Sequence, residues 1–251
     1  MSKISVKVVV TIPHCGIAIP SEYKYDLNID RKQAKRGSDL ATDRLFSLSC
    51  ADVIIRAEVS RYIVDLNRAR DNFTDTGVIM KKDFNGGRVL KNPVTPEQTE
   101  QRLQQYYDPF YSNINSALAG AEKVLLIDGH SFDTVGAKGV VDAGKTRPEL
   151  MLGTNNFKTI SKQTVMRLKT LLEAQGFKVK IDTPYGKNGL AGITMRYGNP
   201  PSVEAVLIEI RKDLYMDEES LEVDRDKLAA LRDKLNSAVL ALVDELDIAG
   251  V

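Results

Sequence analysis

The chain has 251 residues, of which 43% are hydrophobic, and its 35 basic and 34 acidic side chains leave a formal net charge of +1. No basic block or arginine and aromatic stripe indicates a nucleic-acid surface, and no stretch approaches the roughly 18 apolar residues of a membrane span. The N-terminal segment lacks the features of a signal peptide. We therefore expect one α/β domain over 1–251, a cytoplasmic location and a small-molecule partner, with no nucleic acid and no membrane.

Apolar, β-branched runs alternate with helical patterns along the chain. The expected strands are 5–12, 52–58, 61–66, 123–128, 177–182 and 203–210. The expected helices are 40–50, 96–119, 158–175 and 224–246, and the starts of three carry capping signals at Ser38-Asp39, at Thr95-Pro96-Glu97 and at Asp224. This order predicts a mostly parallel central sheet covered by helices on both faces, a three-layer α/β/α fold.

Two long irregular stretches, 69–95 and 131–157, follow expected strands and are rich in Gly, Asn and Asp. Loops of this length in a compact domain are usually functional. We expect them to cover a site, and plain surface insertion is the alternative.

The chain contains two histidines, and each ends an apolar run. His14 closes VKVVVTIPH and His130 closes EKVLLIDGH. Because the carboxyl ends of parallel strands form the crevice where α/β proteins bind ligands, the two imidazoles are expected to share a metal ion. The alternative is a pair of structural histidines.

Carboxylates near each histidine can complete such a site. In GSDLATDRL, either Asp39 or Asp43 can serve as an oxygen ligand, and we favour Asp39; a helix cap explains one of them equally well. In IDGHS, Asp128 lies two residues before His130 and can orient it from behind. Two histidines and one carboxylate leave a fourth position open, which is typical of a hydrolytic Zn²⁺ site.

Arginines and one glutamate supply the remaining candidates. In SRYIVDLNR, Asn67 and Arg68 are suited to holding a substrate carboxylate, with Arg61 at the opposite end of the segment and Arg196 as a further anion contact. A structural arginine paired with a nearby aspartate is the alternative.

Glu209 interrupts a strand that is otherwise apolar at its centre and can act as general base, while Arg211 can neutralise it. Cys15, beside His14, is an alternative nucleophile. Cys15 and Cys50 are too few to form a disulfide framework.

Five motifs in order resemble the N-formylglutamate amidohydrolase family over about residues 8 to 220: PHCG, SD...D, SRYIVDLNR, IDGHS and IEIRKDLYMDE. That family is distantly similar to the zinc carboxypeptidases and aspartoacylases. The resemblance implies a phosphorylase/hydrolase-like fold, His14 and His130 as ligands, Asn67 with Arg68 on the substrate carboxylate, and Glu209 as base. The carboxypeptidase glutamate ligand is absent, because Ile17 occupies its position, and the resemblance assigns that role to Asp39.

The resulting hypothesis is zinc-assisted hydrolysis of a small N-acyl amino acid, foremost N-formyl-L-glutamate, to formate and the free amino acid. Three alternatives stay open at this point. They are an aspartoacylase-like or carboxypeptidase-like hydrolase of another acyl amino acid or peptide, a binding protein that retains the fold without turnover, and a cysteine hydrolase built on Cys15 and His130.

Overall fold

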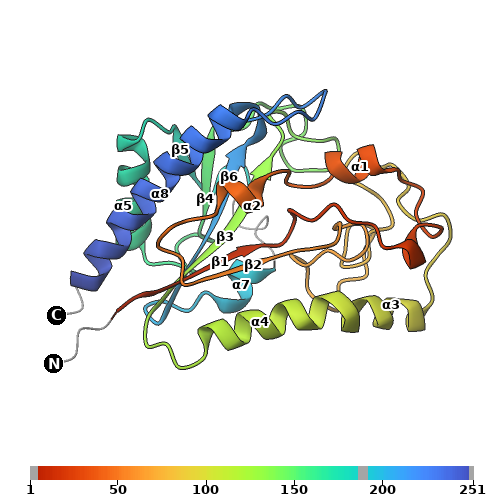
Figure 1. Cartoon of the computed structure of the whole chain (residues 1–251), viewed down its shortest axis with the longest axis horizontal. Coiled ribbons are helices and arrows are strands. Elements are labelled where there is room, and N and C mark those ends of the chain that lie inside the picture. Colours follow the sequence, from red (N-terminus) through yellow and green to blue (C-terminus); the bar gives the residue numbers. More distant parts are fainter. Residues whose placement is uncertain (1–4, 186–191, 249–251) are drawn as a thin grey trace.

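A six-stranded sheet forms the centre of the computed structural model, which describes residues 5–185 and 192–248 (Figure 1). The strand order is β2-β1-β3-β6-β4-β5, and every neighbouring pair is parallel except β4 with β6. The strands are β1 (Lys7–Ile12), β2 (Val53–Arg56), β3 (Val124–Phe132), β4 (Leu150–Gly153), β5 (Val179–Ile181) and β6 (Val203–Arg211). The expected mostly parallel sheet is confirmed.

Helices cover both faces of this sheet, as the sequence pattern predicts (Figure 1). One face carries α2 (Thr42–Leu45), α5 (Lys162–Ala174) and α8 (Arg225–Ile248), and the other carries α3 (Pro96–Arg102), α4 (Asp108–Leu118) and α7 (Ile193–Tyr197). A π-helical turn, η2 (Leu103–Tyr107), joins α3 to α4. The shorter elements are α1 (Arg31–Arg36) and the 3₁₀ turns η1 (Ser21–Tyr23) and η3 (Lys212–Leu214).

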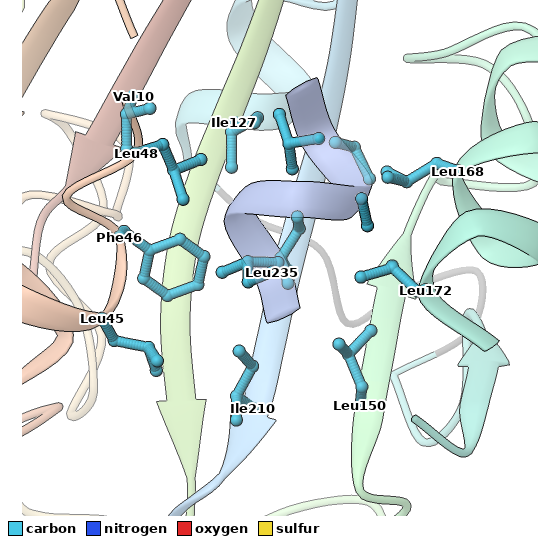
Figure 2. Close-up of a cluster of buried hydrophobic side chains, with 14 of the residues drawn as sticks. Val10, Leu45, Phe46, Leu48, Ile127, Leu150, Leu168, Leu172, Ile210 and Leu235 are labelled. Carbon is cyan, nitrogen blue, oxygen red and sulfur yellow. The ribbon is translucent and has the colours of Figure 1, made fainter. Parts of the chain in front are cut away.

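The core lies in two apolar layers, one on each face of the sheet. Figure 2 shows the first, where Leu235 of α8 and Leu168 of α5 pack with Phe46 against Ile127 of β3 and Ile210 of β6. All nine residues of β3 are buried, which explains why its sequence is continuously apolar up to Asp128 instead of alternating. Burial on both sides fixes the direction of β3 and therefore the place where His130 emerges.

Local signals explain the three long helices that the sequence predicts. Thr95 forms a capping box with Gln98, and Pro96 occupies the first turn of α3. The expected helix 96–119 is thus observed as α3, η2 and α4. The helices expected at 158–175 and 224–246 are observed as α5 and α8, each with shifted bounds.

The segment 61–66 was expected to be a strand, and this prediction is wrong. The segment forms turns instead, because Ile63 N–H donates to the Ser60 carbonyl and the Arg61 side chain binds Asp65 within the same stretch. Its apolar side chains, among them Ile63 and Val64, are buried in the second core layer without belonging to the sheet. The apolar pattern of 61–66 therefore predicted correctly that these side chains are buried, but it predicted wrongly that their backbone forms a strand of the sheet.

Two further expectations need correction. The stretch 131–157 contains β4, a four-residue strand whose sequence does not alternate between apolar and polar residues. The loop between β3 and β4 is therefore only 133–149. The helix expected at 40–50 shrinks to α2, because Ala41 adopts a left-handed conformation with φ of 64° and the last helical residue is Leu45. The preceding helix α1, capped by Asp30, was not predicted.

Candidate metal centre and active site

His14, Asp39 and His130 converge above the carboxyl ends of β1 and β3. Their ligand atoms all lie within 4.8 Å of one another, and all three residues are buried. Asp39 Oδ2 lies 3.6 Å from His14 Nδ1 and 3.0 Å from His130 Nδ1. The sequence-based expectation that the two imidazoles meet is therefore met by the geometry, and the carboxylate that joins them is Asp39, not Asp43.

The second nitrogen of each imidazole faces another buried carboxylate. His14 Nε2 lies 2.8 Å from Asp65 Oδ1, and His130 Nε2 lies 3.1 Å from Asp128 Oδ1. An Nε2–H donated to a carboxylate leaves Nδ1 as the lone-pair donor on the side of Asp39. Such paired orientation is what metal-binding histidines require, so the residues fit a divalent cation.

Charges in the cluster favour a cation. Burial lowers the pKa of His130, but the carboxylate charge and hydrogen bond of Asp128 and the hydrogen bond of Asp39 outweigh it and raise that pKa well above its usual value. Burial raises the pKa of Asp39, but the hydrogen bonds and charges of the two histidines outweigh it and lower the pKa below its usual range. The centre therefore attracts positive charge, which a proton or a metal ion can supply.

Glu209 stands beside His130 on the neighbouring strand, because the β3 and β6 register pairs the two residues directly. Its side chain is buried, and Oε2 has no hydrogen-bond partner among the described residues. Burial raises its pKa to about 7, with the charge of His130 opposing that shift. A carboxylate held this way, unpaired in a cleft, is suited to proton transfer near neutral pH.

These groups line a cavity of about 550 Å³. Both predicted cover loops contribute to its wall: the first cover loop (69–95) through Asp83, Phe84 and Asn85, and the second cover loop (133–149) through residues that include Ala137 and Gly139. Their expected position over the site is confirmed by this lining.

Asn67, Arg61 and Arg68 all border the cavity. Arg61 donates through Nε and Nη2 to Asp65 Oδ2, and Arg68 donates through Nε to the carbonyl of Thr76. The Asn67 amide has protein partners on both sides, since Oδ1 accepts from the Ile193 N–H and Nδ2 donates to Oδ2 of Asp128, the carboxylate behind His130. Asn67 borders the cavity and also supports Asp128, and its contact with a substrate carboxylate stays a prediction.

The structure does not bring three predicted residues to the cavity wall. The Arg196 guanidinium lies over the Tyr111 ring, 4.5 Å from its centroid. Arg211 binds Asp213 and the Arg147 carbonyl, so it does not neutralise Glu209 as expected. Asp43 lies outside the cavity wall. Its negative charge adds to the effect of burial on the Cys15 thiol, and together they raise the pKa of that thiol to about 12.

Sequence reasoning missed several residues of the site. Asp65 was considered only as a partner for arginine, although its place two residues before Asn67 on the same segment was a usable signal. Lys212, Arg147 and Tyr185 also line the cavity. Arg147 and Tyr185 come from segments with no strand-end pattern, whereas Lys212 directly follows β6 and its position was a usable signal.

The fold and the site together define a hydrolase built on a parallel α/β sheet with a candidate metal centre at its strand ends. Residues 6–216 match the model of the family described as FGase, N-formylglutamate amidohydrolase, and the chain belongs to this family. An N-formylglutamate deformylase from Pseudomonas putida is 26% identical over 88% of this chain and 85% of its own length. Its counterpart from Pseudomonas aeruginosa is 26% identical over 89% and 87%.

Solved structures agree on the fold. The N-formylglutamate amidohydrolase from Ralstonia eutropha superposes with a TM-score of 0.85 at 21% identity and covers 98% of this chain and 96% of its own. A gene product of Agrobacterium tumefaciens superposes with a TM-score of 0.70 at 21% identity, over 94% and 91%. In the part of the chain that the structure describes, no helix has the length and apolarity to cross a bilayer.

Proposed function

We propose that this chain hydrolyses N-formyl-L-glutamate, giving formate and L-glutamate. Its family is that of the N-formylglutamate amidohydrolases, and the two Pseudomonas relatives that align with nearly the whole chain are named as N-formylglutamate deformylases. The reaction adds the hydroxyl of water to the formyl carbon and its proton to the amide nitrogen, with cleavage of the C–N bond.

One observation carries the proposal: the two histidines present Nδ1 toward Asp39 while their Nε2 atoms face buried carboxylates. His14, Asp39 and His130 would hold a divalent metal ion, and Zn²⁺ suits a set of two imidazoles and one carboxylate. When bound, such an ion supplies Lewis acidity that polarises the formyl carbonyl and makes water more acidic.

Glu209 performs the proton transfers in this mechanism. Its carboxylate, which lines the cavity, accepts the proton of the attacking water and then donates it to the amide nitrogen as the C–N bond breaks. Its elevated pKa, close to 7, suits both the uptake and the release of that proton. Burial keeps bulk water from competing for the same oxygen.

Arg68 and Arg61 bind substrate carboxylate groups. Both border the cavity, and of the nitrogens of Arg68 only Nε and Nη1 have hydrogen-bond partners among the described residues. A planar guanidinium with a free nitrogen can hold a carboxylate and so fix the formyl group relative to Glu209. Both carboxylates of N-formyl-L-glutamate are suitable partners.

The cysteine mechanism is disfavoured by the surroundings of Cys15. Its thiol lies 3.3 Å from the carbonyls of Ile12 and Ala57, and with its pKa near 12 it stays protonated at neutral pH. A protonated, half-buried thiol is a poor nucleophile.

The test combines metal analysis with a substrate panel. Purified protein should contain about one divalent ion per chain. It should release formate from N-formyl-L-glutamate, lose that activity to a chelator and regain it with Zn²⁺. Preferential hydrolysis of N-acetyl amino acids or peptides would instead identify an aspartoacylase-like or carboxypeptidase-like enzyme, and metal binding without any turnover would identify a binding protein.

A further inference from the structure

Phe84, in the first cover loop, lies against both arginines of the cavity. Its ring centroid is 5.1 Å from Arg61 Cζ and 5.9 Å from Arg68 Cζ. A tight turn presents the ring, since Asp83 Oδ1 accepts hydrogen bonds from the N–H groups of Asn85 and Gly87. One aromatic ring therefore contacts two cations of the same segment, 61–68.

The backbone of Phe84 holds the opposite wall. Its carbonyl accepts a 2.7 Å hydrogen bond from the Gly139 N–H of the second cover loop. The approach is so close that a Cβ on Gly139 would lie 2.7 Å from this oxygen, which only glycine avoids. Asn85 Oδ1 adds a 3.4 Å contact to the Lys138 N–H. The two cover loops are thus joined at Phe84.

The arginines need such support because they differ in how firmly they are held. Arg61 is fixed by two hydrogen bonds to Asp65 Oδ2. Arg68 donates through Nε to the Thr76 carbonyl at 3.1 Å and through Nη1 to the Asn67 carbonyl at 3.4 Å, while its Nε lies 3.9 Å from Asp65 Oδ2, so among the described residues it has no hydrogen bond to a carboxylate. An aromatic face stabilises a guanidinium and screens it from water on one side. The ring therefore restrains the less firmly bound cation, Arg68.

We propose that Phe84 is a positioning residue for substrate recognition: its ring holds Arg68 beside Arg61 to receive a carboxylate, and its carbonyl links that pair to the second cover loop. The inference rests on the proposed function, in which the arginines bind the substrate. It assigns to Phe84 control over carboxylate affinity and none over proton transfer, because its ring contacts the arginines and not Glu209.

The experiment compares Phe84→Leu, which keeps an apolar side chain without an aromatic face, with Phe84→Tyr as the matched aromatic control. Steady-state kinetics on N-formyl-L-glutamate are measured together with calorimetric binding of glutarate, a dicarboxylate with no amide to cleave. Phe84→Leu should raise KM and the glutarate Kd about tenfold, with kcat changed less than about twofold. Phe84→Tyr should match the wild type in all three.

A second variant tests the link between the loops. Gly139→Ala should raise KM in the same direction as Phe84→Leu, because the added Cβ displaces the Phe84 carbonyl. Equal glutarate affinity in the wild type and Phe84→Leu, or a fall in kcat with KM unchanged, would overturn the inference.

The turnover and binding measurements keep the two claims apart. A wild type that binds glutarate in a Phe84-dependent way but releases no formate would reject the deformylase assignment and support the role of Phe84. A wild type with no glutarate affinity would overturn that role even if formate is released.

Discussion

Replacing Glu209 with glutamine tests the centre of the mechanism. The substitution keeps the shape of the side chain and its place opposite His130, but an amide cannot accept the proton that the carboxylate would receive. Loss of a positioned general base typically costs 10²- to 10⁴-fold in rate, so kcat should fall by about that factor, equivalent to roughly 3 to 5 kcal/mol in activation free energy.

Folding should not suffer from the same change. Because burial raises the pKa of Glu209 from 4.5 to about 7, the folded state binds a proton more tightly than the unfolded state. The carboxyl therefore favours folding least above pH 7, where it is ionised in both states. A neutral amide avoids the cost of burying an ionised carboxylate. Metal-free Glu209→Gln should therefore be at least as stable to urea unfolding at pH 8 as the wild type.

The assay measures formate release under saturating substrate, with metal content determined on the same sample. We expect a full complement of metal, a KM near that of the wild type and a kcat lower by at least about 10². A variant that retains more than a tenth of wild-type kcat with its metal bound would refute the assignment of Glu209 as base.

Three further predictions concern the metal centre, the thiol and pH. Asp128→Asn should weaken metal affinity by about 10- to 100-fold, because it removes the carboxylate behind His130; competition with a chromophoric chelator measures this, and unchanged affinity would contradict the orientation described. Iodoacetamide at pH 7 should leave activity intact, because the half-buried thiol of Cys15 is protonated; inactivation that tracks its alkylation would restore the cysteine mechanism. The value of kcat/KM should fall as pH drops through the pKa of Glu209, at or below about 7 since a bound cation would lower it, and a flat acid limb would argue against a titrating base.

The sequence predicted those parts of the site that sit at the ends of buried strands. His14 and His130 each come at the end of a continuous apolar run, which is the pattern of a strand buried on both faces. Because β1 and β3 pair in parallel, the carboxyl ends of the two strands lie at the same edge of the sheet. Glu209 was identified because a carboxylate that interrupts the apolar centre of a strand needs an explanation. In each case local chemistry and the direction of the strand sufficed.

The remaining parts depend on distant contacts that have no local pattern. The orientation of the Asn67 amide depends on Ile193, whose N–H donates to Oδ1 and which lies far along the chain. The antiparallel insertion of β4 between β6 and β5 is set by pairing between Met151 and Glu209, and four residues are too few to show a period. Segment 61–66 illustrates the converse, since its apolar residues pack in the core without entering the sheet.

The three candidate ligands come from chain segments that meet only once β1 and β3 are paired. An unfolded chain therefore cannot present them together, and a metal ion that binds only the native form would shift the folding equilibrium toward that form. If the proposed ion binds there, the thermal stability of the protein would rise with the free concentration of the ion.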